Sequence, residues 1–316
     1  MKTALVTGGA GFIGSHMTDQ LLHDGYTVVV FDNLITGDKK YLPKKAIFIK
    51  GDVRRIHDVE SVFDKYRPNV VFHIAGQAST IVSFDNPTYD MNVNLHGTIH
   101  VIQSAIAHHT PRFLYASSMT VYGHPNTLPI IESTQCSPIS YYGISKYAAE
   151  RFVHATAERK DLSFPFYATS FRMFNVYGPR QSLTNPYQGV MAIFIGNILR
   201  NEPITIFGDG KQARDFIFID DVVRAWISSI DNKKIYNQVS NLGTGKMINI
   251  NSLVSHLLVA FGKNPNTYPI HYKDARQGDQ RFMEADMKQT KKNLSFTPQV
   301  SIENGLAQTI AWAKQA

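Results

Sequence analysis

Short apolar runs alternate with longer, more polar stretches through the first half of the chain. The apolar runs have the length and composition of buried strands, and the stretches between them have helical length. Buried strands separated by helices predict βαβ units, a parallel doubly wound sheet and helices on both of its faces. The expected strands are 2–7, 27–31, 46–50, 69–75, 112–117 and 165–173, and the expected helices are 14–24, 59–66, 92–109 and 143–160.

The alternation weakens after about residue 175, where Gly and Pro punctuate shorter segments. This change predicts a smaller α/β lobe packed on the carboxyl edge of the sheet. The stretch at 215–230, DFIFIDDVVRAWISSI, again has a strand-then-helix pattern, so we expect the chain to return to the first lobe there. The expected division is 1–175, with a return segment at about 215–244, against 176–214 and 245–316.

Composition and charge narrow the classes of function. The 316 residues carry a formal net charge of +7, but the basic residues are scattered in short doublets. Without a basic helix or interleaved aromatic residues, we expect no nucleic-acid partner. No apolar run approaches the roughly 20 residues of a membrane span, so we expect no membrane association and a cytoplasmic location. The single cysteine, Cys136, predicts neither a disulfide nor a zinc site.

Three glycines stand at intervals of three where the first strand must turn into the first helix. They are Gly8, Gly11 and Gly14 in the segment TGGAGFIG. Glycines at this spacing allow a tight turn, close approach to a pyrophosphate and close helix packing, as in a Rossmann-type sheet. Asp32 closes the second strand, where its carboxylate can accept from the hydroxyls of an adenosine ribose and would repel a 2′-phosphate. The pattern therefore predicts a bound dinucleotide, and NAD rather than NADP.

Two further strand ends are candidates for cofactor contacts. Asp52 ends the third strand, where we expect it to meet the adenine edge, and a solvated loop acid is the alternative. Ala75 and Gly76 follow the fourth strand and are expected to pass under the middle of the cofactor, although an ordinary turn explains the glycine too.

A tyrosine and a lysine share one face of a later helix. Tyr142 and Lys146 are at i and i+4, so the ammonium is expected to lower the pKa of the phenol and make it a base for an alcohol proton. Tyr41 and Lys45 have the same spacing but precede a strand with a proline between them, so we set that pair aside. Ser118 lies at the carboxyl end of the fifth strand, where ligands of such sheets bind and a hydroxyl can relay a proton.

With these features in place, the sequence is identified as a member of the extended short-chain dehydrogenase/reductase family. Within that family it most resembles the nucleotide-sugar epimerases of the UDP-galactose 4-epimerase group, and the resemblance covers nearly the whole chain. The motifs that carry it are TGGAGFIG, Asp32-Asn33, GDV, SSMTVYG, Tyr142-x-x-x-Lys146, FRMFNVYGPRQ, RDFIFIDDVVRA and DARQGD.

The resemblance implies roles for the matching positions, beginning with Ser118, Tyr142 and Lys146 as the catalytic trio. The implied NAD contacts, besides Tyr142 and Lys146, are Gly8, Gly11, Phe12, Ile13, Gly14, Asp32, Asn33, Asp52, Val53, Ala75, Gly76 and Asn94. The implied substrate contacts, besides Ser118, are Asn175, Gly189, Val190, Thr205, Phe207, Arg214, Arg276, Asp279 and Met283. Arg214 and Arg276 would clamp the diphosphate, because guanidinium groups form strong forked hydrogen bonds with phosphate.

Several departures from related groups bear on the reaction. Dehydratase relatives carry an Asp-Glu pair where this chain has Met119 and Thr120, so water elimination lacks its acid and base. Uronic-acid epimerases tend to have Thr at the position of Asn175, which argues against a substrate carboxylate. Met283 matches the position that gates C2 substituents, and its adaptable side chain does not decide whether N-acetyl sugars enter.

The implied activity is NAD-dependent 4-epimerisation of a UDP-sugar, either UDP-glucose and UDP-galactose or their N-acetyl counterparts. A transient 4-keto sugar would form, and hydride would return to its opposite face. Three alternatives stay open: a nucleotide-sugar reductase or dehydrogenase, an epimerase of UDP-glucuronate or a dTDP-sugar, and a binding module without turnover.

Two helix features have competing interpretations. In the family, the helices at 92–109 and 142–160 pair across a two-fold axis, so the resemblance implies a homodimer. An intramolecular packing face explains their apolar stripes equally well. His96 and His100 are at i and i+4, but no third ligand is evident, so we expect no metal site.

Overall fold

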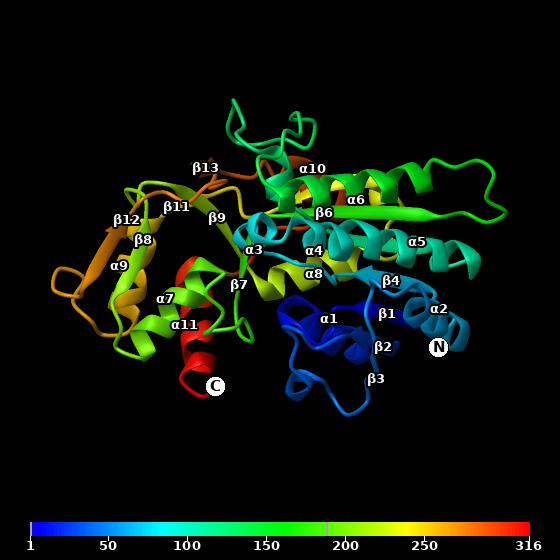
Figure 1. The fold of residues 1–316 in the computed structure, drawn as a ribbon, viewed down its shortest axis with the longest axis horizontal. Coiled ribbons are helices and arrows are strands. Elements are labelled where there is room, and N and C mark those ends of the chain that lie inside the picture. Colours follow the sequence, from blue (N-terminus) through cyan, green and yellow to red (C-terminus); the bar gives the residue numbers. More distant parts are fainter. Residues whose placement is uncertain (1, 188) are drawn as a thin grey trace.

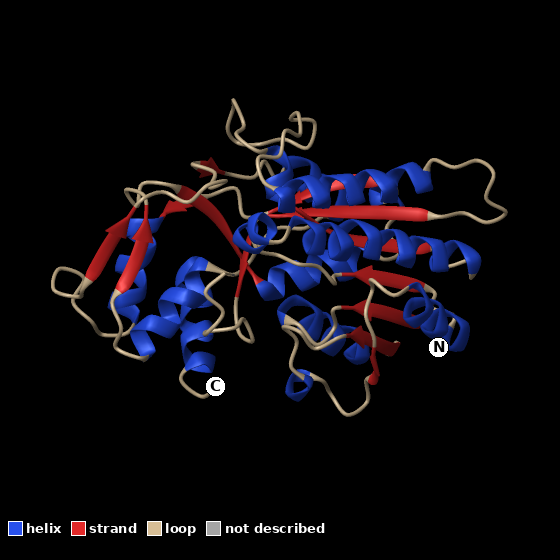
Figure 2. Ribbon diagram, in the orientation of Figure 1, coloured by secondary structure: helices blue, strands red, loops and turns tan. Residues whose placement is uncertain are grey.

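A computed structural model describes residues 2–187 and 189–316 and is built on a seven-stranded parallel sheet (Figures 1 and 2). Its spatial order is β10-β6-β5-β4-β1-β2-β3, so the chain winds outward in both directions from β1 and β4. The strands are β1 (Thr3–Thr7), β2 (Thr27–Asp32), β3 (Ile47–Lys50), β4 (Val70–His73), β5 (Arg112–Ser118), β6 (Tyr167–Met173) and β10 (Gln238–Leu242). The predicted α/β doubly wound sheet is confirmed.

Successive residues of each central strand are buried on opposite faces of the sheet, which explains why the strands are almost continuously apolar. On one face, Val6 packs in a cluster with Met17 of α1 (Phe12–His23) and Trp226 of α8 (Ile219–Ser229). On the other face, Leu5 packs in a second cluster with residues of α2 (Ile56–Tyr66), α5 (Gly97–Ala107) and α6 (Tyr141–Ala157). The sheet is thus covered by helices on both sides.

A second lobe, at the left of Figure 1, is built around smaller sheets. Strand β9 (Ala213–Phe218) pairs with β7 (Asn175–Tyr177), β11 (Met247–Asn249) and β13 (Phe282–Met283). A separate pair joins β8 (Ile204–Phe207) to β12 (Ile270–Lys273). Helices α7 (Val190–Leu199), α9 (Ile250–Ala260) and α11 (Ile302–Ala313) lie against these strands (Figure 1).

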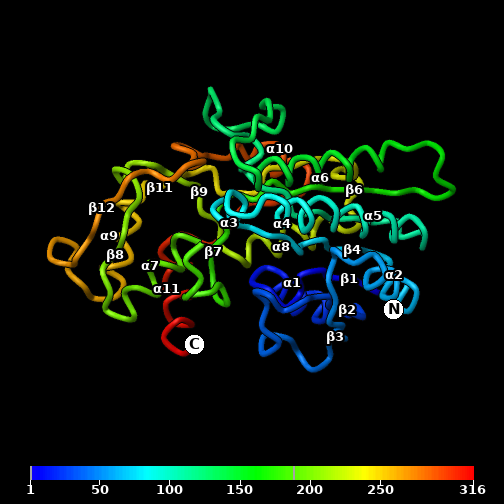
Figure 3. Tube along the Cα trace, viewed as in Figure 1, coloured from blue at the N-terminus to red at the C-terminus, as the bar shows by residue number. Residues whose placement is uncertain are grey.

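The segment expected to return to the first lobe divides between the two lobes. β9 belongs to the second lobe, whereas α8 and β10 belong to the central sheet and its cover. α10 (Lys288–Leu294) packs beside β10, although the chain around it lies in the second lobe. The N-terminus starts in the first lobe and the C-terminus ends beside α11 (Figure 3).

The remaining helices are short. The long helix expected at 92–109 begins instead with a π-helical turn, η2 (Asn92–His96), followed by α5. The others are α3 (Thr80–Asp85), α4 (Pro87–Met91) and the 3₁₀ turns η1 (Lys39–Tyr41), η3 (Met119–Tyr122) and η4 (Lys233–Ile235). Among the described residues, none of the helices combines the length and hydropathy of a bilayer-spanning segment.

Candidate active site

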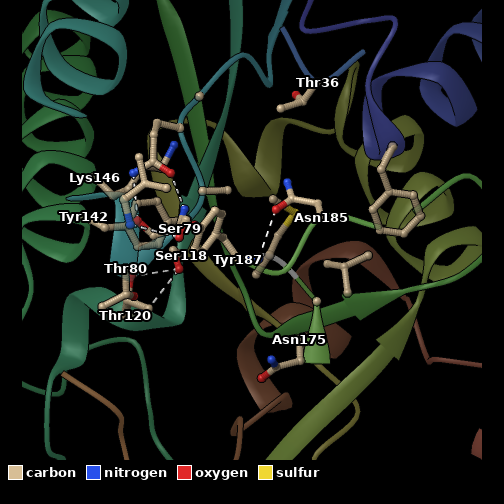
Figure 4. Close-up of a pocket in the computed structure, with 18 of the residues that line it drawn as sticks. Thr36, Ser79, Thr80, Ser118, Thr120, Tyr142, Lys146, Asn175, Asn185 and Tyr187 are labelled. Atoms are coloured by element: carbon tan, nitrogen blue, oxygen red, sulfur yellow. Dashed lines mark hydrogen bonds between the residues drawn. The ribbon is translucent and has the colours of Figure 1, made fainter. Parts of the chain in front are cut away.

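One large cleft, of about 680 Å³, runs along the carboxyl ends of the central strands and into the second lobe. In Figure 4, Tyr142, Lys146, Ser118 and Thr120 gather on one side of it, and Asn175 and Asn185 lie across from them. The cleft is lined by residues of β1–α1, β2, the loop after β4, β5, α6 and the second lobe. Ligands of doubly wound sheets bind at this edge.

The glycine turn between β1 and α1 forms one wall of the cleft. Gly8 has φ +69°, and a Cβ on it would lie 2.8 Å from the backbone of Ala75. A Cβ on Gly14 would lie 2.1 Å from the carbonyl oxygen of Gly8, so this position needs glycine for helix packing. Gly11 differs, because its φ is −79° and its Cβ would meet only that carbonyl, at 3.2 Å. The fold itself demands little of Gly11, which fits a ligand that approaches its backbone closely.

The start of α1 is open to an anion. Gly11 is the N-cap residue and supplies no side-chain oxygen, so the first backbone N–H groups have no side-chain cap. Free N–H groups at a helix start favour a phosphate. The turn, the uncapped helix start and the neighbouring carboxylate of Asp32 therefore fit a dinucleotide.

Asp32 fixes the turn while facing the cleft. Its two carboxylate oxygens accept hydrogen bonds from the backbone N–H groups of Ala10 (2.9 Å) and Leu34 (2.8 Å). Burial raises the pKa of Asp32, and the two N–H donors oppose that rise. The carboxylate retains lone pairs that can accept from ribose hydroxyls.

The Asp52 carboxylate accepts hydrogen bonds from neighbouring side chains of the protein. Arg54 donates to it through Nη2 at 2.6 Å and Nε at 3.0 Å, and the Asn33 amide donates at 3.1 Å. These contacts, with Arg54 first, lower the pKa of Asp52 to about 2. Asp52 is outside the cleft lining, whereas its neighbours Asn33 and Val53 line it. The structure therefore makes Asp52 a support for the wall at Asn33.

A buried network holds the loop after β4. Asn94 of η2 accepts from the Gln77 N–H at 2.9 Å and donates to the Gln77 carbonyl at 3.0 Å. Asp90, which is fully buried, accepts from Asn94, from Gln77 and from Ser145 of α6. Asn94 thus lies behind the cleft wall and supports the backbone at Ala75 and Gly76, which line it.

The catalytic candidates meet where β5 and α6 approach each other. Ser118 ends β5, and the Ser140 hydroxyl caps α6 by accepting from the Gly143 N–H at 3.1 Å. Tyr142 is the second residue of that helix, and Lys146 follows one turn later with 4% of its surface exposed. The Lys146 ammonium lies 4.4 Å from the centre of the Tyr115 ring. All three predicted side chains line the same cleft, and Tyr41–Lys45 does not.

The titration of this pair differs from the expected direction. Desolvation raises the pKa of Tyr142 to about 12, although a hydrogen bond with Ser118 lowers it. Burial lowers the pKa of Lys146 to about 7, against the opposing effect of Asp90 and Glu150. In this structure burial outweighs the lowering of the Tyr142 pKa that is expected from Lys146, because burial disfavours the charged form of each group.

The second lobe contributes groups suited to a polar ligand. The side-chain oxygen of Asn175 is buried and has no hydrogen-bond partner among the described residues. Arg214, which is buried, forms an ion pair with Asp279, and Arg276 stacks 3.7 Å from the centre of the Phe207 ring. Gly189, Val190 and Thr205 also line the cleft, as predicted.

One substrate contact implied by the family resemblance, Met283, lies outside the cleft lining. Met283 is fully buried and is outside the cleft lining. It pairs in β13 with Arg214 of β9, and the alternation of the strand turns its side chain into the core and exposes Phe282. The role of Met283 beside the sugar therefore stays a prediction.

Some cleft residues were not anticipated, because no short motif marks them. They include Thr36, Ser79, Thr80, Thr120, Gln181, Asn185 and Tyr187.

The histidines at 96 and 100 belong to no cluster of metal ligands: the described residues hold no group of three or more potential ligands, and His100 bonds the Val53 carbonyl at 2.8 Å.

Comparison with known proteins identifies the group. Residues 4–243 match the model of the NAD dependent epimerase/dehydratase family. The chain is 34% identical over 311 residues to a putative UDP-glucose 4-epimerase of Methanocaldococcus jannaschii, covering 98% of each. Curated decarboxylases and other epimerases match at 28% to 31% identity.

Two solved structures are close in fold. UDP-glucose 4-epimerase of Thermotoga maritima with UDP-glucose has a TM-score of 0.93 and 36% identity, covering 99% of each chain. UDP-glucose 4-epimerase of Thermus thermophilus in complex with NAD has a TM-score of 0.92 and 31% identity, again covering 99% of each.

Proposed function

The chain belongs to the NAD-dependent epimerase/dehydratase family, within the extended short-chain dehydrogenases/reductases, and from this premise we propose that it is a UDP-sugar 4-epimerase. Its cofactor is NAD, and UDP-glucose and UDP-galactose are the proposed substrate pair. The first lobe would hold NAD and the second the nucleotide sugar. The observation that carries the proposal is the meeting of Ser118, Tyr142 and Lys146 in one cleft with the glycine turn and Asp32.

The chain's own groups supply the proton chemistry. Tyr142 takes the proton of the sugar C4 hydroxyl, and Ser118 donates a hydrogen bond at the same oxygen. When bound, NAD supplies a hydride acceptor at C4 that can return the hydride. Lys146, on the same face of α6, favours the phenolate form through its charge. After the 4-keto sugar has rotated in the cleft, Tyr142 returns the proton to the C4 oxygen.

The residues beside Ser118 separate epimerisation from elimination. Met119 is buried, and Thr120 carries a hydroxyl, so neither supplies a carboxylate to remove water from the sugar. This favours a reaction that begins and ends at C4.

Proposed substrate contacts lie at the other end of the cleft. Arg214 and Arg276 are suited to the diphosphate, Asp279 to the uridine ribose, and the unpartnered oxygen of Asn175 to a hydroxyl or N–H donor. For the sugar to rotate within the cleft, the nucleotide must be held firmly while the sugar itself makes few contacts.

We also propose that two copies associate through η2–α5 and α6. Helices α5 and α6 lie side by side in Figure 1, η2 also contacts α6, and α6 exposes Tyr141, Ile144 and Phe152, each at 47% to 49%. Exposed apolar side chains in a row favour a four-helix contact between two copies. A cytoplasmic location is proposed with this enzyme.

The proposal is tested by incubating the protein with UDP-glucose, UDP-N-acetylglucosamine and UDP-glucuronate and following each by proton NMR. We expect UDP-glucose to yield UDP-galactose, and the Tyr142→Phe variant to yield none while still binding NAD. Accumulation of NADH in proportion to substrate would instead support a dehydrogenase, and loss of water or CO₂ would support a dehydratase or decarboxylase.

A further inference from the structure

Thr120 makes two contacts with the catalytic serine from the turn that follows β5. Its backbone N–H donates to Ser118 Oγ at 3.2 Å, and its hydroxyl donates to the same oxygen at 2.9 Å. Figure 4 shows both contacts, with Tyr142 and Lys146 on the same side of the cleft. The N–H contact caps η3, so the hydroxyl contact is additional to what the turn needs.

These two contacts use the accepting capacity of Ser118. A serine hydroxyl has one proton to donate and two lone pairs to accept with. Two donors from Thr120 occupy both lone pairs, so the hydroxyl proton of Ser118 is left to point toward another acceptor. Tyr142 lines the cleft beside Ser118, and Ser118 lowers the pKa of its phenol.

We propose that Thr120 is a positioning residue that directs the single hydroxyl proton of Ser118 into the cleft, toward the Tyr142 oxygen in the free enzyme and toward the sugar oxygen when substrate is bound. The inference rests on the proposed epimerase function, because it concerns the proton that function moves. Thr120 acts through Ser118 and transfers no proton itself. The Thr120 hydroxyl can orient Ser118 as a donor without placing a carboxylate beside the sugar, which suits a reaction that removes no water.

The expected pH dependence follows from the direction of that hydrogen bond. A donor to the phenolate stabilises it, so loss of the contact raises the pKa of Tyr142 and moves the rise of kcat/KM to higher pH. The ionisable groups that face Tyr142 are Lys146 on α6, Asp90 on α4 and Tyr115 on β5. None of these is changed by a substitution at Thr120.

The test compares Thr120→Val, which keeps the shape and removes the hydroxyl, with Thr120→Ser, which keeps the hydroxyl. UDP-glucose turnover is measured from pH 6 to pH 10 in the NAD-bound enzyme. We expect Thr120→Val to lower kcat about tenfold, the order of one lost oriented hydrogen bond, and to shift the rise of kcat/KM upward. Thr120→Ser should stay within about twofold and keep the original profile.

Two controls separate positioning from structure. Thr156→Val removes a buried hydroxyl that bonds the Phe152 carbonyl elsewhere on α6, and it should leave kcat and the pH profile unchanged. In a Ser118→Ala background, Thr120→Val should have no further effect, because the serine through which it acts is gone.

The inference is contradicted if Thr120→Val lowers kcat without moving the pH profile, or if it has its full effect in the Ser118→Ala background. Absence of turnover in the wild-type enzyme is a different result. It would overturn the proposed function first, and this inference with it.

Discussion

Lys146 places a cation where the protein offers little to stabilise it. Its ammonium is buried, lies against the Tyr115 ring and has no carboxylate within ion-pair distance among the described residues. Burial lowers its pKa to about 7, so the charged form costs folding free energy. A buried lysine retained at such a cost is typical of a functional site.

Replacing this lysine therefore should stabilise the NAD-free protein while abolishing turnover. An unfolded lysine has a pKa of about 10.4, so wild-type stability should rise as pH increases from 7 to 10. Lys146→Met should raise the melting temperature most below pH 7, and the gain should shrink toward pH 10. Thermal unfolding at pH 6.5 and pH 10 measures this. An equal loss of stability at both pH values would contradict it.

The residues of the site differ in how far sequence alone could find them. Tyr142, Lys146 and Ser118 follow from spacing and from the end of a strand. Thr120 could not be predicted as a partner of Ser118, because its role depends on the geometry of a 3₁₀ turn. The burial of Met283 could not be predicted, because β13 has only two residues and position along the chain does not reveal which of their side chains faces the core.

Among the elements, the β1–α1 turn shows how one glycine pattern combines two demands. Gly8 and Gly14 are required by the fold, through a positive φ and a close backbone contact. Gly11 has a negative φ, and its Cβ would meet only the Gly8 carbonyl oxygen, at 3.2 Å, so the ligand explains this glycine better than the fold does. The sequence predicted the three as one motif, and the structure separates them.

This separation predicts opposite outcomes for two alanine substitutions. Gly14→Ala should destabilise the protein by about 1–3 kcal/mol or more, because its Cβ would press on the Gly8 carbonyl. Gly11→Ala should change the melting temperature of the NAD-free protein little and weaken NAD binding at least tenfold. Calorimetry of unfolding and of NAD binding distinguishes them. Unchanged NAD affinity in Gly11→Ala would show that no ligand approaches this residue.

The helices were predicted with less precision than the strands. Six strands of the central sheet were found from apolar runs, because strands buried on both faces are apolar throughout. The seventh, β10, has a mixed sequence (QVSNL) and was included only within a return segment. The helix expected at 92–109 contains the π-turn η2, whose register places Asn94 against Gln77. Apolar spacing does not encode that change of register.

At the scale of the whole molecule, the two lobes share one cleft but differ in construction. The central sheet is predictable because its order follows from repeated βαβ units. The second lobe was predicted only as irregular, since its strands have two to six residues and pair across large sequence separations. The exposed apolar face of α6 also concerns the whole molecule, because we propose that it contacts a second copy of the chain.

The proposed dimer predicts a mass of about twice the 35.5 kDa of one chain in sedimentation velocity. Ile144→Lys and Phe152→Lys should shift the protein to monomers, because each would bury a charge in the contact. Val259→Lys is the matched control, since Val259 is an exposed apolar residue on α9 of the second lobe. A wild-type monomer, or a dimer unaffected by both α6 variants, would contradict the assignment.

The most direct test of the account follows one hydrogen atom. UDP-glucose carrying deuterium at C4 is converted by the wild-type enzyme, and the product is analysed by NMR and mass spectrometry. The account predicts UDP-galactose that keeps the deuterium at C4, with no net NADH, because the hydride leaves and returns within one cleft. Deuterium lost to water, or NADH formed in proportion to product, would contradict it.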